Sequence, residues 1–314
     1  MKLHLKPIAE QTIVITGASS GIGLTTARRA ARAGARVVLT ARNADALETI
    51  AAQLAHEGCE VLAMPSDVGS YGELQEVAEL ARRRFGGFDT WVNNAGISIF
   101  GPIDRVPLAD MRRLFETNFW GVVHGSLIAA GELRRHGGAL INIGSEVSDV
   151  ALPLQTLYSA SKHAVKGFTD GLRLELGAAG APVSVTLIKP AAIDTMFVPH
   201  ARNYMDVEPR LPPPIYAPDV VAQAILYAAE HPKRDIYAGG ASKLFSVFNR
   251  ALPRATDKYV ERFMPRQQRS DRPAAAVDHS ALYRPGAGLH ERQGQKGHVC
   301  ESSLYTEITT FGGR

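Results

Sequence analysis

Short runs of β-branched and apolar residues alternate along the chain with longer stretches of helical periodicity. The first run, residues 12–16, stops at Gly17, as a buried strand does when it ends in a turn. We predict strands at 12–16, 36–40, 61–64, 90–92, 139–143, 183–189 and 235–238, and helices at 22–33, 44–56, 72–85, 109–135, 157–176 and 218–229. Apolar strands that alternate with helices predict a parallel sheet covered on both faces. With right-handed crossovers, this is an α/β fold with a doubly wound parallel sheet of seven strands.

The regular alternation ends near Gly239. We therefore predict a single domain, residues 1–240, followed by a C-terminal extension, residues 241–314. Inside the domain, residues 194–217 are too long and too rich in proline for a simple connection, which is typical of a lid or a binding loop.

The extension has three parts. Residues 243–264 have the pattern of an amphipathic helix interrupted at Pro253. Residues 266–292 are rich in Arg, Gln, Pro, Ala and Gly, which is typical of extended or disordered chain. The more apolar residues 302–306 are candidates to dock back on the body. The extension could serve as an active-site cover, an oligomer contact or an interfacial helix.

Composition narrows the class of protein. Of 314 residues, 45% are hydrophobic and 21% are charged, as in ordinary soluble globular proteins. The formal charge of +4 is mild, and no basic run is interleaved with aromatic residues, so we expect no nucleic-acid partner. Cys59 and Cys300 form no disulfide framework and no set with metal-ligand spacing, so we expect no metal. Without a signal-like or spanning apolar stretch, we expect a cytoplasmic protein unless the extension attaches it to a membrane.

A glycine-rich segment joins the first predicted strand to the first helix, and it reads Thr16-Gly17-Ala18-Ser19-Ser20-Gly21-Ile22-Gly23. Glycines let the backbone turn sharply and approach a pyrophosphate, and a helix N-terminus offers free N–H groups and partial positive charge. At this junction the segment predicts a dinucleotide site of the Rossmann type, although its G-x-x-x-G-x-G spacing differs from the usual G-x-G-x-x-G.

The end of the second predicted strand indicates which dinucleotide is bound. An acidic residue there would favour NAD, but the chain has Arg42 and no carboxylate. An arginine can pair with the 2′-phosphate of NADP(H), so we predict that cofactor. Asp67 and Val68 could lie beside the adenine or simply begin a helix. Asn93-Asn94-Ala95-Gly96 ends the fourth strand at the ligand-binding edge, and we expect Asn93 to be both structural and cofactor-lining.

Tyr158 and Lys162 are four residues apart on one predicted helix and share a face. A nearby ammonium lowers the pKa of a tyrosine toward the working pH, so that the phenol can exchange a proton with an alkoxide. Taken alone, this spacing is more often a surface pair. Ser145, at the end of the fifth strand, could hydrogen-bond a carbonyl oxygen, and Asn118, in the preceding helix, could hold a water.

The glycine-rich segment, Asn93-Asn94-Ala95-Gly96, Asn118, Ser145 and Tyr158-x-x-x-Lys162, in this order, closely resemble the short-chain dehydrogenase/reductase family over about residues 8–240. The resemblance implies that Tyr158 is the general acid/base and that Ser145 orients and polarises the substrate oxygen. It implies that Lys162 lowers the pKa of Tyr158 and holds the nicotinamide ribose, and that Asn118 supports a water-linked proton relay through Lys162.

The same resemblance extends to the stretch after the sixth strand, Pro190-Ala191-Ala192-Ile193-Asp194-Thr195. Ile193 and Thr195 fit a nicotinamide-binding position, whereas Ala191 replaces a glycine of the family, which puts the local backbone geometry in question. The strand end Leu39-Thr40-Ala41-Arg42 is similar to NADP(H)-preferring members. The residues expected to contact the cofactor are Gly17, Ser19, Ser20, Gly21, Ile22, Gly23, Arg42, Asp67, Val68, Asn94, Ala95, Gly96, Tyr158, Lys162, Pro190, Ile193 and Thr195.

We therefore expect an NADP(H)-dependent oxidoreductase that moves a hydride between the nicotinamide and a carbonyl/alcohol carbon. The alternatives are a non-catalytic NADP(H)-sensing protein and a membrane-peripheral lipid oxidoreductase; the first is disfavoured because all four catalytic positions are filled. Side chains in the 194–217 loop suggest an apolar or aromatic substrate, or simply pack the loop down: Met196, Phe197, Tyr204, Met205 and Tyr216. The resemblance also implies a homodimer or homotetramer.

Overall fold

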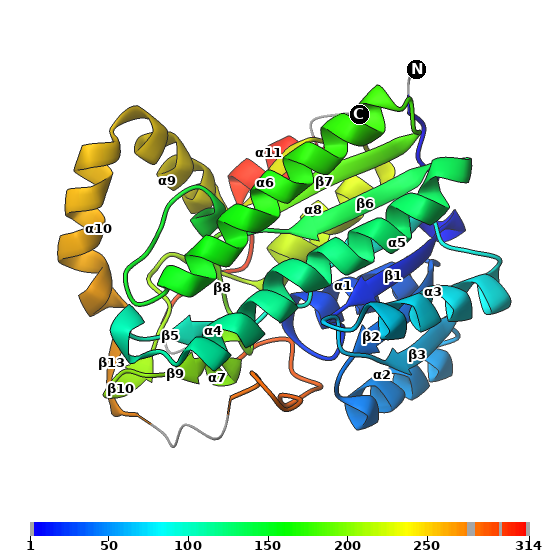
Figure 1. Ribbon diagram of the computed structural model, residues 1–314. Coiled ribbons are helices and arrows are strands. Elements are labelled where there is room, and N and C mark those ends of the chain that lie inside the picture. The colour runs from blue at the N-terminus through cyan, green and yellow to red at the C-terminus, as the bar shows by residue number, and fades with distance from the viewer. Residues whose placement is uncertain (1–2, 275–279, 295–296, 312–314) are drawn as a thin grey trace.

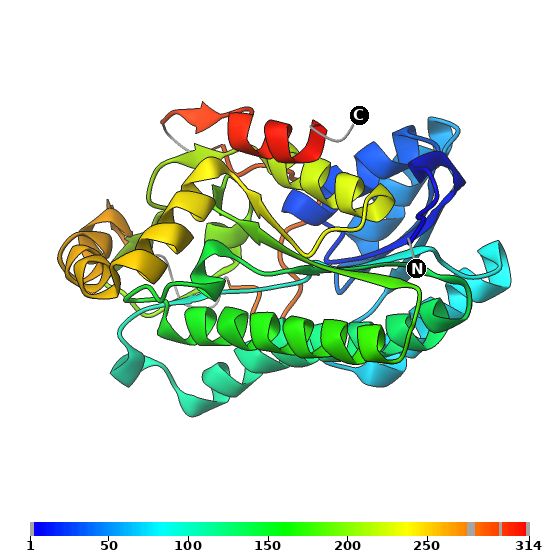
Figure 2. The ribbon, with the colours of Figure 1, turned by 90° about the horizontal axis from the view of Figure 1, so that it is seen from above.

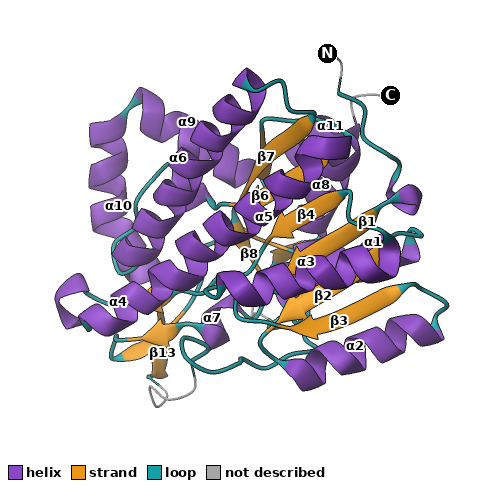
Figure 3. Ribbon diagram, turned by 45° about the vertical axis from the view of Figure 1, so that its right-hand side comes forward, coloured by secondary structure: helices purple, strands orange, loops and turns teal. Residues whose placement is uncertain are grey.

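The computed structural model describes residues 3–274, 280–294 and 297–311 (Figure 1). Its centre is a seven-stranded sheet in the order β12-β7-β6-β4-β1-β2-β3, and all of its strands are parallel (Figure 3). The strands are β1 (Thr12–Thr16), β2 (Arg36–Ala41), β3 (Val61–Pro65), β4 (Thr90–Asn93), β6 (Gly138–Ile143), β7 (Val183–Pro190) and β12 (Asp235–Ala238). The predicted doubly wound sheet is confirmed.

Helices cover both faces of this sheet. Figure 2 shows α5 and α6 on one side and α1, α8 and α11 on the other. The helices of the sheet are α1 (Gly21–Arg32), α2 (Ala44–His56), α3 (Tyr71–Phe85), α4 (Leu108–Phe115), α5 (Gly121–His136), α6 (Thr156–Ala178) and α8 (Pro218–Glu230). Short 3-10 helices are η1 (Ile8–Glu10), η2 (Ile103–Arg105) and η4 (Glu146–Ser148).

The two cores follow from the alternation of side chains along each strand. In β1, Ile13 and Ile15 point into the core beneath α1, α2 and α8, whereas Val14 points into the core beneath α3 and α5. All three side chains are fully buried. Each strand therefore needs apolar residues on both faces, which is why the sequence shows continuous apolar runs.

The direction in which successive strands are added to the sheet reverses at β1. β1 pairs with β2 on one side and with β4 on the other. The connections leave these two sides in opposite directions, so a crevice opens at the carboxyl ends of β1 and β4. This crevice receives the glycine-rich segment from β1 and Asn94 from the end of β4.

Residues 194–217, predicted as one long loop, form a folded cap with short elements of its own. The small elements on this side of the molecule are β5 (Ile99–Phe100), β8 (Ala192–Ile193), α7 (Phe197–His200), β9 (Arg202–Asn203), β10 (Val207–Pro209) and β11 (Ile215–Tyr216). β5 pairs with β9, and β11 pairs with β8. A small core that includes Phe100, Val198 and Met205 holds the cap together.

The C-terminal extension continues directly from β12, and its last elements pack against the domain that contains the sheet. Its elements are α9 (Gly240–Ala251), α10 (Pro253–Gln267), β13 (Arg269–Pro273), β14 (Val299–Cys300) and α11 (Leu304–Phe311). The helix break predicted at Pro253 is present, because α9 ends at Ala251 and α10 begins at Pro253. β13 pairs with β10, and α11 packs against α8 and β12, as expected for residues 302–306.

Residues 266–292 were expected to be extended or disordered. The described part is extended and packed: Leu282 is only 1% exposed, against Ile97, Ile99 and Leu114. The composition argument missed this because a few buried residues, such as Leu282, and hydrogen bonds to distant segments fasten the segment. Residues 275–279 lie outside the described residues.

A buried carboxylate ties α9 to the loop after β6. Asp149 accepts hydrogen bonds from Lys189 Nζ at 3.0 Å, Ser246 Oγ at 2.8 Å and Tyr237 Oη at 3.2 Å, and it also pairs with Lys166. Burial alone would raise the pKa of Asp149, but these hydrogen bonds and the charge of Lys189 hold it well below its usual range. The network joins the first helix of the extension to the segment that carries Ser145.

Candidate active site

The glycine-rich segment is shaped by close contacts that exclude side chains. Gly17 has φ +67°, and a Cβ there would lie 2.8 Å from Ala95 Cα. A Cβ on Gly23 would lie 2.3 Å from Gly17 O and 2.6 Å from Asn94 Nδ2. The first position therefore needs glycine for conformation and the last for packing, and the N-terminus of α1 faces the crevice without side chains in front of it, where Gly21 N donates to His290 O.

Adjacent asparagines at the end of β4 have different tasks. Asn94 Nδ2 donates to Thr16 O at 2.9 Å, which fixes the glycine-rich segment to β4. We expected Asn93 both to line the cofactor site and to support it. The expectation that Asn93 lines the site is wrong. Its side chain is 2% exposed and bonds Asn142 and Ser126 inside the protein. Successive residues of a strand point to opposite sides, so only one can face the crevice.

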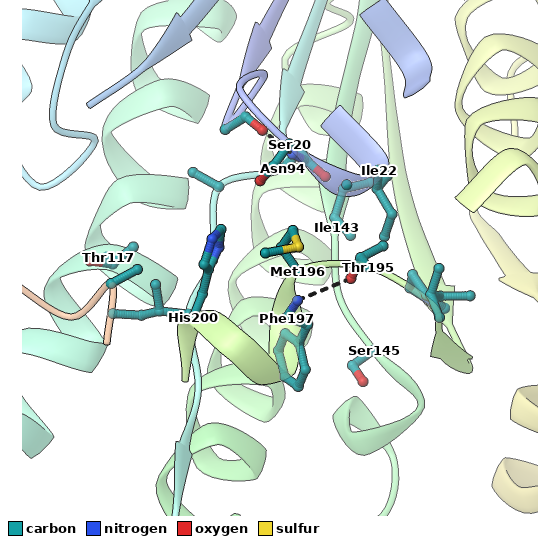
Figure 4. Close-up of a pocket in the computed structure, with 18 of the residues that line it drawn as sticks. Ser20, Ile22, Asn94, Thr117, Ile143, Ser145, Thr195, Met196, Phe197 and His200 are labelled. Atoms are coloured by element: carbon teal, nitrogen blue, oxygen red, sulfur yellow. Dashed lines mark hydrogen bonds between the residues drawn. The ribbon is translucent and has the colours of Figure 1, made fainter. Parts of the chain in front are cut away.

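A continuous cavity runs along the carboxyl ends of the strands, and Figure 4 shows part of its wall. The sequence-predicted residues that line it are Gly17, Ser19, Ser20, Gly21, Ile22, Arg42, Asp67, Val68, Asn94, Ala95, Gly96, Ser145, Tyr158, Lys162, Pro190, Ile193 and Thr195. Gly23 and Asn118 do not line it and lie behind the wall.

Ala191 does not strain the segment that carries Ile193 and Thr195. Among the described non-glycine residues, only Leu154 and Leu289 have a positive φ. The alanine in the family's glycine position therefore adopts an ordinary backbone conformation. Of the aromatic and methionine side chains predicted in this region, Met196 and Phe197 line the cavity, whereas Tyr204, Met205 and Tyr216 do not.

Tyr158, Ser145 and Lys162 meet at the substrate end of the cavity. Tyr158 is in the first turn of α6, and its hydroxyl is hydrogen-bonded to Ser145. Lys162, one turn later, donates from Nζ to Ile143 O at 2.8 Å and lies 5.8 Å from the centre of the Tyr158 ring. Phe197 packs edge-on against that ring at 5.2 Å. The three polar groups therefore converge on one place, although they come from two different segments.

The pKa of Tyr158 is shifted opposite to the sequence expectation. Burial raises it and the charge of Glu146 adds to this, while the hydrogen bond with Ser145 opposes them. Lys162 is not among the groups that shift the pKa of Tyr158, and burial lowers the pKa of Lys162 itself to about 8. A tyrosine with a raised pKa holds its proton at neutral pH and is ready to donate it.

Asn118 lies in a π-helical turn, Glu116–Trp120, between α4 and α5. Its side chain is fully buried and completely paired: Oδ1 accepts from Ile97 N, and Nδ2 donates to Ile97 O and Ser161 Oγ. The amide is therefore committed to fixing the turn after β4 against α6. Sequence periodicity predicted one long helix here and could not reveal the π turn, which often marks a functional site.

Arg42 and Asp67 sit at the adenosine end of the cavity. The Arg42 guanidinium donates to Leu282 O at 3.3 Å and to Ala281 O, both in the extension. Burial alone would raise the pKa of Asp67, but hydrogen bonds from Arg113 and from Gly69 N leave it lowered. Arg113 also donates to Leu282 O, at 3.1 Å. The sequence carried no signal for Arg113, which approaches from α4.

Among the cavity residues that the sequence analysis did not single out are Glu146, Gln155, Thr117 and His200. Burial raises the pKa of Glu146, directly after Ser145, to about 7. Thr117 Oγ1 and His200 Nε2 are buried and have no hydrogen-bond partner within the described residues. In Figure 4 the His200 ring points into the cavity on the side of Thr117, away from Ser145. Nothing in the local sequence around His200 indicated this position, which depends on how α7 folds back.

The residues present fit a dinucleotide. The glycine cradle excludes side chains where a pyrophosphate would approach, and two buried polar atoms in the cavity wall lack a partner until a polar ligand enters. In the part of the chain that the structure describes, no three His, Cys, Asp or Glu side chains gather as metal ligands, and no helix has the length and apolar character to cross a membrane.

Fold and site together define an oxidoreductase with a nicotinamide-dinucleotide site, and comparison with known proteins identifies its family. The sequence profile described as short chain dehydrogenase matches residues 11–205. The chain therefore belongs to the short-chain dehydrogenase/reductase family.

Relatives and solved structures agree with this assignment. The uncharacterized oxidoreductase YxnA of Bacillus subtilis is 46% identical over 98% of this chain and 87% of its own, a match that must include most of the extension. The uncharacterized oxidoreductase SA2266 of Staphylococcus aureus is 34% identical over 72% of this chain and 94% of its own. An alcohol dehydrogenase from the archaeon Thermococcus sibiricus, solved in complex with 5-hydroxy-NADP, is 30% identical, with a TM-score of 0.63 over 72% of this chain and 94% of its own.

Proposed function

We propose that this protein transfers a hydride between NADP(H) and a carbonyl/alcohol carbon, with Tyr158 as the general acid/base. The observation that carries the proposal is the meeting of Tyr158, Ser145 and Lys162 in the same cavity as the glycine cradle. Residues 1–240 form the dinucleotide-binding domain in this proposal, and residues 241–314 extend it.

In the reductive direction, the Ser145 and Tyr158 hydroxyls hold the substrate oxygen. The nicotinamide supplies the hydride when it is bound. As negative charge develops on the substrate oxygen, Tyr158, which burial keeps protonated, donates its proton there. Lys162 holds the nicotinamide ribose and carries the compensating positive charge. Asn118 positions this machinery, because its fully paired side chain locks the turn after β4 to α6.

The substrate end of the cavity supports an apolar carbonyl compound. Leu152, Met196, Phe197 and Leu211 line it, with the carboxyl of Glu146 as a polar group among them. A screen of NADPH oxidation against ketones, aldehydes, quinones and steroids tests the proposed reaction class. The absence of turnover with every class, together with intact NADPH binding, would favour the sensing alternative.

In this proposal, Arg42 determines the preference for NADP(H) over NAD(H). We expect Arg42→Asp to lower kcat/KM for NADPH by about 10- to 100-fold, because it removes a charge-assisted contact to the 2′-phosphate. NADH should be affected far less, so the ratio of the two kcat/KM values is the measurement. Arg32→Asp is the matched control: it makes the same change of charge at a surface arginine that pairs with Glu57 outside the cavity, and it should leave the ratio unchanged. An unchanged ratio in Arg42→Asp would refute the assignment.

A second candidate, a membrane-peripheral lipid oxidoreductase, is favoured by the surface of α9 and α10, which stand away from the sheet at the left of Figure 1. Leu244, Val247 and Phe248 lie on one face of α9, and with Leu252 directly after the helix they are 44–70% exposed. The opposite face of α9 carries Ser246 and Asn249, which bond Asp149. A row of exposed basic side chains follows along α10: Arg254, Lys258, Arg262 and Arg266. Apolar and basic residues side by side suit an anionic lipid surface.

Flotation with anionic vesicles tests this second candidate. We expect the wild type to float and Leu244→Ser with Phe248→Ser to remain in the lower fractions. Leu108→Ser, an equally exposed leucine on α4, is the control and should float like the wild type. A wild type that does not float would exclude the membrane-peripheral reading and leave the reductase proposal intact.

A further inference from the structure

A segment of the extension crosses the open side of the cofactor cavity. Residues 281–291, which we call the strap, run from the end of β2 to the start of α1. Figure 1 shows this part of the chain in orange to red, below β2. Ala281, Pro285 and Gly286 of the strap line the cavity itself. The strap is therefore the outer wall of the predicted dinucleotide site.

Contacts at both ends fasten the strap. At its first end, Leu282 is buried against Ile97 and Leu114, and Tyr283 Oη donates to Asp110 Oδ1 at 2.9 Å. At its far end, the Glu291 carboxylate accepts from Thr25 Oγ1 at 3.0 Å and pairs with Arg28, both on α1.

Between these ends, the strap pairs with the glycine-rich segment through main-chain groups. Leu289 N donates to Ser19 O at 2.9 Å, and Gly21 N donates to His290 O at 2.9 Å. Leu289 has φ +71°, a conformation that a leucine seldom adopts, and its side chain is exposed. The exposed Leu289 side chain does not stabilise this backbone conformation by packing. We therefore attribute the conformation to the hydrogen bond from Leu289 N to Ser19 O.

Small residues let the strap lie directly on its neighbours. A Cβ on Gly286 would lie 2.6 Å from His200 Nε2, and a Cβ on Gly288 would lie 2.3 Å from Ala46 Cβ in α2. Neither glycine has a positive φ, so the need for glycine here is purely one of space. A side chain at Gly288 would lift the strap from α2.

The hydrogen bond from Gly21 N to His290 O is compatible with two roles of the strap. The strap could compete with the dinucleotide for the N–H groups of the glycine-rich segment, or the strap could close over the bound dinucleotide. The cavity beneath the strap decides between them. Thr117 Oγ1 lines that space, buried and without a partner within the described residues, whereas the His200 ring packs directly on the strap backbone at Gly286. The strap thus leaves the Thr117 hydroxyl beneath it unsatisfied instead of filling the space in front of it, which is the arrangement expected of a cover over a polar ligand.

We propose that the strap, residues 281–291, closes over the bound dinucleotide and must open for the cofactor to exchange. The His200 ring packs against the strap at Gly286, and Arg42 would join strap and cofactor because its guanidinium reaches Ala281 O and Leu282 O from the proposed adenosine end. This inference rests on the proposed function only in taking the ligand to be NADP(H). Lids of this kind keep water out and commonly set the rate of product release.

The test measures NADPH release without turnover. NADPH fluorescence in a stopped-flow chase gives its dissociation rate from the wild type and from Gly288→Ala. We expect Gly288→Ala to release NADPH about tenfold faster, because overpacking lifts the strap. Arg284→Ala, an exposed strap position without a hydrogen-bond partner in the described chain, is the matched control and should release NADPH at the wild-type rate. An unchanged rate in Gly288→Ala, or tighter NADPH binding, would overturn the proposal.

Hydrogen exchange on the wild type provides a second measurement that needs no variant. NADPH should slow amide exchange in the peptide covering residues 281–291, because the closed strap gains a partner beneath it. A strap that competes with the cofactor would be displaced, and its exchange would become faster. If NADPH does not bind at all, the proposed function fails; if it binds and exchange in the strap does not slow, only the strap proposal fails.

Discussion

Replacing Tyr158 with phenylalanine is expected to lower kcat by about 10²–10⁴-fold while NADPH binding stays close to normal. The ring, its packing on Phe197 and the position of Lys162 are all retained, and only the hydroxyl that bonds Ser145 is lost. Steady-state turnover with the best carbonyl substrate, beside NADPH binding followed by fluorescence, separates the two effects. Retained turnover would mean that another group handles the proton.

Tyr204→Phe is the matched control for this variant, because its hydroxyl donates to Asp110 outside the cavity. It should keep wild-type turnover. The pH profile of the same assay adds a second check. Burial raises the pKa of Tyr158 and lowers that of Lys162 to about 8, so Lys162 is the first of the two to lose its proton as the pH rises. Wild-type turnover should therefore fall above about pH 8.

Replacing Asp149 with alanine is expected to destabilise the protein by about 3–5 kcal/mol, the largest effect on folding that we predict. The variant leaves the Lys189 ammonium, whose side chain is 4% exposed, without its buried partner. Burial alone would lower the pKa of Lys189, and Asp149, with a smaller contribution from Tyr237, raises it. Urea unfolding at neutral pH measures the loss. A loss below about 1 kcal/mol would mean that the ion pair is offset by its own desolvation.

Lys166→Met is the control, because Lys166 also pairs with Asp149 but is 37% exposed, and it should cost far less. The same hydrogen-bond network makes the free energy of unfolding depend on pH in the acidic range. The pKa of folded Asp149 lies below the ordinary value of 3.8, so its contribution is complete above that pH and is lost as the pH falls further. Asp149→Ala should therefore lose less stability than the wild type on acidification below about pH 4.

Much of the fold could be predicted because parallel strands have a local signature. The run at β1 is apolar on both faces and ends at Gly17, and the same pattern repeats for each strand of the sheet. The site residues could be predicted for a related reason: they follow strands, and the carboxyl ends of parallel strands meet along one edge. Gly17, Asn94 and Ser145 are far apart in the chain but line one cavity.

Other features could not be predicted because they depend on contacts distant in sequence. Tyr158 and Lys162 are a helical pair in the sequence, but the raised pKa of Tyr158 comes from burial and from Glu146. The composition of residues 266–292 indicated no packing, yet Leu282 finds a core made by Ile97 and Leu114. Arg113 and His200 enter the site from α4 and α7, whose placement no local pattern encodes.

The sequence by itself determined the doubly wound sheet, and it indicated the glycine-rich segment and the side chains that we propose as catalytic, because each follows from short-range patterns of apolar residues, glycines and spacing. Only the tertiary structure decided which asparagine of the pair faces the cavity, which direction the pKa of Tyr158 moves and where the extension lies. These depend on burial and on main-chain hydrogen bonds between segments more than 200 residues apart, such as Gly21 N to His290 O. Electrostatic shifts and strap closure arise only once such segments share one low-dielectric, close-packed space.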